Sequence, residues 1–516
     1  MKRVVPTESI HTAIPYLLLS MILLIQGLAI YLFNDGKLIY NLDDPYIHLS
    51  LARNIAHGHY GINLIEPAAP SSSILWPVIL AIFARLPLFE YVPLMLNIGF
   101  GGGILYVLHK IINLIFHDRL SAATKAFLIS VLGIVASISP LVWSGMEHLL
   151  QILLAVIIFY NLLDLEINNK LNRSLMVAVI INALVRYESL AISIPVLLFI
   201  FLKGYRRAAL LGLVLTLVPI AAFSYFLHRL GLGYLPTSII IKGSQFSDKT
   251  SFEILIDNLA YAARTKTWYL FLTIIISLLI GLRRKTHIYF KLTVSLSILL
   301  QVVFSTSTNP YHRYESYMVI YALLAWIFLY KEVIANLFTS SKKYLSIITV
   351  IVILVFINYF NYFFYIFYTP MMSHSIYSQQ YHMALFSSKY YDKNIGVNDI
   401  GLVSYMDNDY TLDLFGLSNM EVIDYRKTKK PGWMNTIADK YNVDLIMIYD
   451  EWFTNHRPSD WIKIGELKTK LPVAATAYSD VAFYVRKPSN VVEVRQLIEQ
   501  FSQILPANTE FRFAPE

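Results

Sequence analysis

Two adjacent aspartates, Asp43 and Asp44, begin the segment whose residue types could most readily do chemistry. Asp44 precedes Pro45, which predicts a helix with Asp44 as N-cap and proline at its first position, and Gly58 predicts the helix end. This helix gives Asp43 no structural role. A carboxylate near the positive N-terminal end of a helix stays ionised, so Asp43 could act as a general base.

Charged residues also gather at four later points that border apolar stretches. A polar group at membrane depth is costly and usually functional. Each cluster can equally be an interfacial anchor with its charge in the headgroup region. The clusters are Glu147-His148, Arg186 with Glu188, Lys242, and His312-Arg313-Tyr314-Glu315.

The elements that must position these residues are membrane helices. The chain is 56% hydrophobic and only 15% charged, against about a quarter charged in soluble domains. Runs of about 20 apolar residues match a hydrocarbon core of about 30 Å. The sequence predicts eleven spans, at 11–33, 92–116, 121–139, 147–164, 174–185, 189–202, 208–228, 267–282, 288–304, 316–334 and 344–367. The short segment 72–86 is predicted to lie along the membrane interface.

The orientation follows from the basic residues. With a cytoplasmic N-terminus, most Lys and Arg of the short loops lie inside, including Arg283-Arg284-Lys285. The five charged clusters then share the outer face, with outer loops 34–91 and 229–266. A twelfth span at 72–86 would invert every later loop, so eleven is favoured. No basic, aromatic-interleaved surface suggests nucleic-acid binding, and the absence of cysteine excludes disulfides and thiolate sites.

The last part of the chain has a different pattern. Residues 369–516 alternate short apolar runs (395–405, 443–449 and 481–486) with polar turns and with helical stretches near 433–441 and 490–504. This pattern predicts a soluble α/β domain. The expected architecture is therefore an α-helical polytopic membrane domain, 1–368, followed by an extracytoplasmic domain, 369–516.

The motifs resemble those of GT-C glycosyltransferases that use polyprenyl-phosphate sugars, in particular bacterial arabinofuranosyl- and mannosyltransferases. The segment from Asp43 to Trp76 resembles their first outer loop. Later motifs follow in the same order: Ser144-Gly145-Met146-Glu147, Arg186-Tyr187-Glu188, Leu235-Pro236-Thr237-Ser238, His312-Arg313-Tyr314-Glu315 and Val397-Asn398-Asp399-Ile400-Gly401. Pro45, Tyr187 and Thr237 depart from the family pattern.

The resemblance implies an inverting transfer of a sugar from an undecaprenyl- or decaprenyl-phosphate donor to an envelope glycan, glycolipid or protein, in the inner membrane. Asp43 and Asp44 would be catalytic. Cations would stabilise the departing phosphate, and guanidinium suits it best; the candidates are Arg186, Lys242 and Arg313. Candidate substrate-binding residues are Tyr46, His48, Arg53, Glu147, His148, Glu188, His312 and Glu315. No cofactor is certain; a divalent metal could use Asp44, Glu147 or His148, although no ligand spacing is diagnostic.

Two other classes of function fit parts of the sequence. A polysaccharide polymerase or flippase should carry charges at mid-span and inverted repeats, and neither is visible. A non-catalytic membrane scaffold that presents the tail to partners would differ from an enzyme in tolerating Asp43→Ala.

Overall fold

The computed structural model describes residues 7–242, 253, 256, 260, 266–280, 286–304, 313–339 and 364–515. The chain forms two compact units. The first unit comprises Met1–Ile25, Leu94–Ala222 and Lys249–Phe367. The second unit comprises Gln26–Pro93, Phe223–Asp248 and Tyr368–Glu516, so it combines the first long loop, a short middle segment and the tail.

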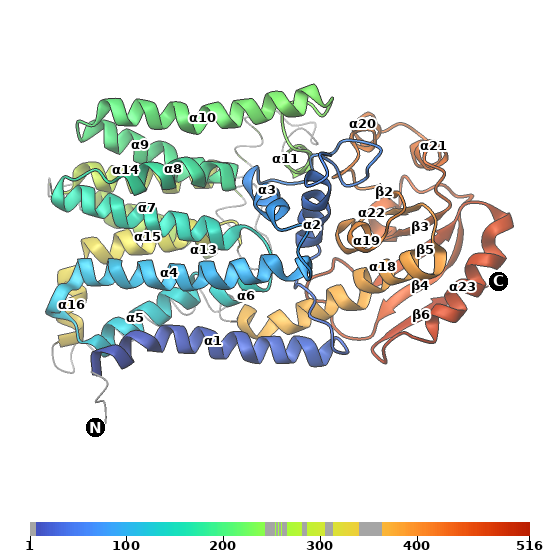
Figure 1. The fold of residues 1–516 in the computed structure, drawn as a ribbon, viewed down its shortest axis with the longest axis horizontal. Helices are drawn as coiled ribbons and strands as arrows, with labels where there is room; N and C mark the ends of the chain where they lie inside the picture. The colour runs from blue at the N-terminus through green and yellow to red at the C-terminus, as the bar shows by residue number, and fades with distance from the viewer. Residues whose placement is uncertain are drawn as a thin grey trace. The chain divides into compact units, whose positions relative to one another are not determined.

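The first unit is built from helices, which Figure 1 shows as a bundle of roughly aligned rods. Helix α7 packs against α8 and α15, and α9 packs against α8 and α14. The helices that lie wholly or largely in this unit are α1 (Thr7–Phe33), α4 (Val92–Phe116), α5 (Ala122–Val135), α6 (Ile138–Val142), α7 (His148–Asn168), α8 (Arg173–Val185), α9 (Leu190–Leu202), α10 (Arg206–Arg229), α13 (Lys266–Ile280), α14 (Ile288–Phe304), α15 (Ser316–Leu329) and α16 (Lys331–Thr339).

Several of these helices are apolar enough to cross a membrane. Within the described residues, α1, α4, α7 and α10 meet this criterion by length and composition, and the bent pair α15–α16 could make a fifth crossing. Helices α8 and α9 have 13 residues each, about 20 Å at 1.5 Å per residue, which is short of the hydrocarbon thickness. The count of eleven spans therefore stays a prediction. The predicted span 344–367 lies mostly outside the described residues.

Two predicted spans are wrong as single helices. The stretch 121–139 breaks at Ser137, whose φ of 53° is left-handed, so that α5 and α6 are separate. The stretch 316–334 bends by 77° between α15 and α16. At this bend the charged residues Lys331 and Glu332 follow Tyr330, and Glu332 pairs with Arg119 at an exposed position. A straight helix would carry these charges toward the hydrocarbon core, where they are costly.

The second unit holds a six-stranded mixed sheet. Its strand order is β2-β1-β3-β5-β4-β6. β1 pairs in parallel with both β2 and β3, whereas the pairs β3–β5, β5–β4 and β4–β6 are antiparallel. The strands are β1 (Ile395–Val397), β2 (Thr411–Asp413), β3 (Leu445–Ile448), β4 (Ile462–Thr469), β5 (Asp480–Val485) and β6 (Thr509–Phe513). This confirms a sheet-containing C-terminal domain.

Short helices connect and cover the strands. Trp433, Met434 and Ile437 of one helix, α21, pack into the main core of the sheet. The helices of the tail are α18 (His382–Phe386), α19 (Gly401–Met406), α20 (Met420–Thr428), α21 (Trp433–Lys440), α22 (Asp450–Phe453) and α23 (Val491–Ser502). A helical segment precedes β1 from 364 to 391 and contains π-helical turns at Tyr377–Tyr381 and Ser387–Tyr391. The structure thus continues as helix across residue 369, where the soluble α/β domain was predicted to begin.

The first long loop contributes two helices to this unit. α2 (Asp44–Ile55) packs against α3 (Leu75–Ile82) and against α19 of the tail. Every residue of α2 from Pro45 to Ala52 is buried. α3 has eight residues, with Trp76 buried and Ile82 three-quarters exposed; its place along the membrane interface stays a prediction. The second unit also contains α11 (Thr237–Lys242).

Candidate functional site

The carboxylate of Asp43 is bound to the beginning of α19. Its Oδ2 accepts a hydrogen bond from the backbone N–H of Gly401 at 2.7 Å, and its Oδ1 accepts one from Leu402 at 2.8 Å. The first N–H groups of a helix have no partner inside the helix, so a side-chain oxygen satisfies them. Asp43 therefore caps a helix of the tail, more than 350 residues away in sequence.

Gly401 is what allows this close approach. A Cβ at position 401 would lie 2.2 Å from the backbone oxygen of Asp43 and 2.5 Å from its Cγ. Real Cβ atoms do not come so close to backbone atoms, and here the obstructing atoms include the backbone. A side chain at this position would displace Asp43, so the glycine is required by the contact.

The contact lies at the topological switch point of the sheet. After β1 the chain forms β2 on one side of β1 and then β3 on the other side. In open α/β sheets, ligands bind outside the carboxyl ends of the strands at such a switch point. Asp399 follows the end of β1, Tyr449 follows the end of β3, and the Asn398 Oδ1 accepts the backbone N–H of Tyr449 at 2.8 Å. The acidic motif of the first loop thus meets the place where topology predicts a ligand.

Three carboxylates concentrate negative charge here. Burial is the largest cause that raises the pKa of Asp43 above the ordinary carboxyl range, and the charge of Asp399 adds to it. The two N–H bonds to Asp43 oppose this rise of its pKa. Burial also raises the pKa of Asp399, and the charge of Asp44 contributes. Such a cluster holds protons more tightly than separate carboxylates, and sites of this kind are often functional.

Polar residues of the preceding helical segment complete the surroundings of Asp399. Within the π-helical turn, Gln380 donates from Nε2 to the Asp399 Oδ2 at 3.0 Å and to the hydroxyl of Tyr449 at 3.2 Å. The Tyr449 hydroxyl donates to the Gln379 Oε1 at 2.9 Å. Trp452 lies next to this group, with its ring 5.2 Å from the ring of Tyr449. The π-turn orients two adjacent glutamines toward one site, as these turns often do.

Further contacts fasten the first loop to the tail. Arg53 donates from Nη2 to the backbone oxygen of Tyr405 at 2.9 Å, with its guanidinium 4.4 Å from that ring's centre. The amide of Asn63 exchanges two hydrogen bonds of 3.0 Å with the backbone of Thr411 on the edge strand β2. Glu66 accepts from the hydroxyls of Tyr410 at 2.6 Å and Tyr441 at 2.7 Å. These bonds hold the loop in one register on the sheet.

The middle segment of the second unit joins the same assembly. The backbone N–H and hydroxyl of Thr237 both donate to the backbone oxygen of Ala69, at 3.0 and 2.8 Å. The same hydroxyl also contacts the backbone oxygen of Leu417. Three of the motifs that were separate in sequence, around Asp43, Thr237 and Asp399, therefore belong to one unit. The side chain of Lys242 lies outside what the structure describes.

A second polar cluster lies in the first unit. Arg186, between α8 and α9, donates to Glu147 at 2.5 Å and to Glu188 at 2.8 Å. Glu147 precedes α7 and is fully buried, and Arg186 is 3% exposed. The hydroxyl of Tyr317 donates to the backbone oxygen of Glu188 at 2.8 Å, which ties α15 to the group. A buried arginine shared by two carboxylates is first of all a cross-link between helices.

Aromatic contacts extend this cluster to the fourth motif. The ring of Tyr314 lies 4.8 Å from the guanidinium of Arg186 and 5.1 Å from that of Arg313. The ring of His148 lies 5.6 Å from the same tyrosine. Glu315 is buried and stands at the N-cap of α15. Residues predicted from three different motifs therefore come together, whereas His312 lies outside the described residues.

The predicted N-cap of α2 needs correction, whereas the catalytic roles of Asp43 and Asp44 stay predictions. Helix α2 begins at Asp44, with Asp43 rather than Asp44 before it, and no side chain caps its start. The prediction of Asp44 as N-cap is wrong because the helix already includes Asp44, and the residue before it, Asp43, bonds to a distant helix. Tyr46 and His48 are buried in α2; the hydroxyl of Tyr46 accepts the backbone N–H of Tyr40 at 3.2 Å.

Asp44, Glu147 and His148 stay candidates for binding a divalent metal ion. Within the described parts of the chain, no three His, Asp or Glu side chains are placed to share an ion. Glu147 is engaged with Arg186.

The sequence alone missed Gly401, Gln379, Gln380 and Tyr449 as parts of the site. Only Gly401 carried a signal, since a glycine in Val397-Asn398-Asp399-Ile400-Gly401 belongs to the quoted motif. The two glutamines lie in a stretch with no recognisable pattern, and their role depends on the π-turn.

Comparisons with known proteins give a partial picture. A family model described as a domain of unknown function, DUF8728, matches residues 373–484. No curated protein sequence matches the chain.

Three solved structures of the Archaeoglobus fulgidus oligosaccharyltransferase are similar to it. Over 96% of this chain, the apo form has 12% identity and a TM-score of 0.43 and is covered to 76%. The form tethered to an acceptor peptide containing the NVT sequon has 11% sequence identity and a TM-score of 0.42, and 75% of its own length is covered. The complex with an inhibitory peptide and a dolichol-phosphate has 11% sequence identity and a TM-score of 0.40, and 75% of its own length is covered. A likeness of this size assigns no activity to this chain.

Proposed function

We propose that this protein is an inverting glycosyltransferase of the GT-C type, which moves a sugar from a polyprenyl-phosphate donor to an acceptor hydroxyl of an envelope glycan, glycolipid or protein. The observation that carries the proposal is the junction of the acidic loop motif with the switch point of the tail sheet. Asp43, Asp44 and Asp399 meet there, next to Gln380 and Tyr449. A non-catalytic scaffold would have no need for two buried carboxyl groups with raised pKa values, those of Asp43 and Asp399.

We assign the role of general base to Asp44. Both oxygens of Asp43 already accept backbone N–H groups, so its task is to position the loop on α19. Asp44 is the first residue of α2 and retains partial exposure. Its place in the first turn of α2 puts its carboxyl group at the positive end of the helix dipole.

The proposed reaction balances as follows. The carboxylate of Asp44 takes the proton of the acceptor hydroxyl as its oxygen attacks the anomeric carbon of the donor. The bond from that carbon to the phosphate oxygen breaks with its electron pair, which leaves polyprenyl phosphate and inverts the anomeric centre. The developing charge on the phosphate requires a cation, and a guanidinium can bind it in bidentate fashion.

We assign this phosphate contact to Arg313. Arg186 is already shared by two carboxylates, and their charge offsets the attraction that it could offer to a phosphate. Arg313 lies in the turn that precedes α15, against Tyr314. Glu147 and Glu188 then serve to hold Arg186 and the helix ends in place.

The proposal includes the setting. The protein would lie in the inner membrane of a bacterium, with its N-terminus in the cytoplasm, eleven spans, and residues after 368 outside. A reporter enzyme fused after 368 should be active only outside the cytoplasm, and one fused at Arg206 only inside. Cytoplasmic activity of the tail fusion would contradict this topology.

The activity itself can be tested on the purified full-length protein. Lipids that co-purify are identified by mass spectrometry, and a panel of undecaprenyl- and decaprenyl-phosphate sugars is then supplied with cell-envelope acceptor extract. Release of free polyprenyl phosphate is measured. We expect release by the natural sequence and by Asp424→Ala, an exposed aspartate on α20, and none by the double variant Asp43→Ala/Asp44→Ala. Equal release by the double variant would exclude the acidic loop from the reaction.

A further inference from the structure

Two hollows lie where α1, α4 and α5 of the first unit meet, and we call this line of contact the seam. Neither hollow is lined by the polar cluster around Arg186. The larger has a volume of about 420 Å³ and is lined by α1, α4, α5 and the turn between the last two. The smaller, of about 30 Å³, is lined by α1, α4, α5 and α6 with Ile366. Pro15 borders both, so they adjoin.

The lining residues follow one face of each helix. On α5, Lys125 and Ile129 line the larger hollow, and Gly133 lines the smaller one, which is a spacing of four. On α4, Leu105 lines the smaller hollow and His109 the larger, again four apart. Residues at this spacing lie above one another on a helix. The seam therefore runs along the helix axes from a polar end to an apolar end.

The polar end could hold an anion. Lys125 is half-buried in the wall of the larger hollow, and no ion pair of its ammonium is present among the described residues. The wall also includes the start of α5, where the hydroxyl of Ser121 accepts the backbone N–H of Thr124 at 3.2 Å. Helix N-termini and lysine both favour phosphate. Asp118 borders the hollow as well, but it is exposed to solvent.

Two histidines add donors to the same wall. The Nδ2 of Asn113 lies within hydrogen-bond distance of the Nε2 of His109, at 2.9 Å. The Nδ1 of His11 is buried, and within the described parts of the chain it has no hydrogen-bond partner. Buried polar atoms are nearly always bonded. The Nδ1 of His11 is therefore available to a ligand in the hollow.

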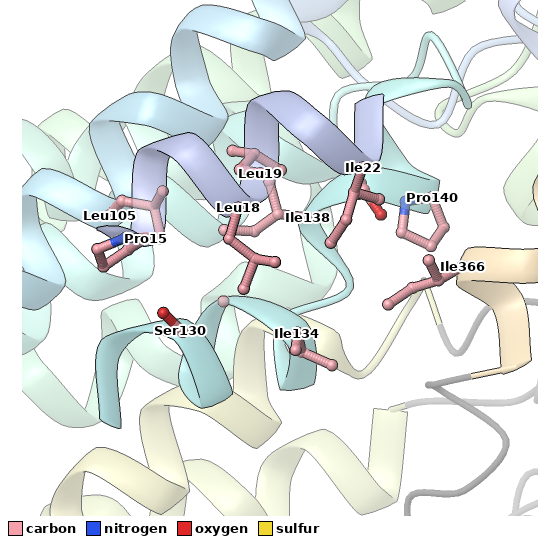
Figure 2. A pocket seen from close by; sticks show the side chains of 12 residues that line it. Pro15, Leu18, Leu19, Ile22, Leu105, Ser130, Ile134, Ile138, Pro140 and Ile366 are labelled. Atoms are coloured by element: carbon pink, nitrogen blue, oxygen red, sulfur yellow. The ribbon is translucent and has the colours of Figure 1, made fainter. Parts of the chain in front are cut away.

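The apolar end is a notch between hydrocarbon side chains. Figure 2 shows Leu18, Leu19 and Ile22 of α1 together with Ile134 and Ile138 around it. Gly133 and Ser130 keep the notch open, since their side chains are small. α1 itself buries only 11% of its apolar window inside the protein. The notch therefore faces the hydrocarbon phase in a membrane.

We propose that this seam binds a membrane lipid with a phosphate headgroup, which places its phosphate near Lys125 and part of one chain against the notch. The larger hollow has the volume of ligand sites, about 300–1,000 Å³. It lies at the ends of α1 and α4, which are both long enough to cross a membrane, and therefore at headgroup depth. Basic pockets between membrane helices bind anionic headgroups for the same reason.

The proposal can be tested with delipidated full-length protein. Dioleoyl phosphatidylglycerol, dioleoyl phosphatidylcholine and inorganic phosphate are titrated, and bound lipid is counted by native mass spectrometry. We expect one phosphatidylglycerol to bind at least tenfold more tightly than phosphatidylcholine. Lys125→Gln should remove this preference, while Lys110→Gln, which alters an exposed lysine on α4 that does not line the hollow, should keep it.

The apolar end requires a separate measurement. Ser130→Leu should fill the notch and weaken both lipids at least fivefold, whereas Ala123→Leu on the exposed side of α5 should not. If Ser130→Leu does not fold, Ser130→Val gives the same test. Inorganic phosphate that displaces the lipid completely, or full binding by the filled variants, would mean an anion site alone and would overturn the lipid proposal. Equal binding by the Lys125 and Lys110 variants would overturn it as well.

Discussion

The polar cluster around Arg186 and the one around Asp43 and Asp399 both contain buried carboxyl groups, but the groups that bond to these carboxyls differ. In the first unit, a buried arginine satisfies two carboxylates, so charge is neutralised where water is excluded. In the second unit, Asp43 and Asp399 lie near the end of β1, and the backbone N–H groups of Gly401 and Leu402 bond to Asp43 while Gln380 bonds to Asp399. A neutralised ion pair suits a structural link between helices. Carboxyl groups whose pKa is raised suit proton transfer.

The two clusters also differ in how far apart in the sequence their partners lie. Arg186 links helices that are close in the chain, whereas Asp43 links segments more than 350 residues apart. Loss of the first should loosen a bundle, and loss of the second should detach a reactive loop from its sheet. Substitutions in each cluster can test this division of labour.

The largest effect is expected from Asp44→Asn. If Asp44 is the base, kcat should fall about 10³-fold, within the range for a lost general base, with little change in unfolding temperature. Asp43→Asn should lower both activity and stability, because its amide NH₂ would face a backbone N–H of Gly401 or Leu402. Release of polyprenyl phosphate and thermal unfolding in detergent measure the two quantities. A stable Asp43→Asn enzyme with the lower kcat would reverse the roles.

A large loss of stability is expected from Glu147→Gln. Removing one partner of a buried ion pair typically costs about 3–5 kcal/mol, and Arg186 would keep only Glu188. Thermal unfolding should show this loss, with residual kcat of the folded fraction close to normal. Glu332→Gln is the matched control, since its pair with Arg119 is exposed and worth little. A stable Glu147→Gln protein without activity would instead place Glu147 in the reaction.

Arg313→Lys should separate phosphate binding from anchoring. Lysine keeps the charge but loses the bidentate geometry, so kcat should fall about 10²-fold, as for a lost transition-state donor, while donor KM changes less. Steady-state kinetics with a fixed acceptor measure both constants. Near-normal turnover would show that Arg313 is an interfacial anchor, a role that lysine fills equally well.

The smallest effect concerns pH. The pKa values of Asp43 and Asp399 are raised in the folded protein, so above the ordinary carboxyl range the folded state holds more protons than the unfolded state. Stability should therefore fall as pH rises from about 4 through the raised pKa values, by at most about 1.4 kcal/mol per pH unit for each carboxyl that stays protonated. Asp399→Asn mimics the protonated form and should flatten this dependence, and Asp424→Asn should not. Unfolding temperature measured from about pH 4.5 to 8.5, the range in which these carboxyls titrate, decides between the two outcomes. An unchanged slope in Asp399→Asn would show that its carboxyl is not part of the cluster.

Local pattern determined much of the secondary structure. The predicted stretch 92–116 coincides with α4, and the helical stretches 433–441 and 490–504 contain α21 and α23. The runs 443–449 and 481–486 correspond to β3 and β5. Apolar periodicity and length are properties of neighbouring residues, so they can be found without the fold. The exposed or short strands β2, β4 and β6 were missed because pairing partners, rather than local pattern, stabilise them.

The residue types of both clusters were visible in the sequence, since Asp43, Asp44, Glu147, Arg186, Glu188 and Arg313 were all singled out there. Their partners were not. Only tertiary structure joined Asp43 to the N–H groups of Gly401 and Leu402, and Arg186 to Glu147. A carboxylate in a sequence can be a cap, a base or half of an ion pair, and what selects among these is the atom about 3 Å away, which long-range packing alone supplies.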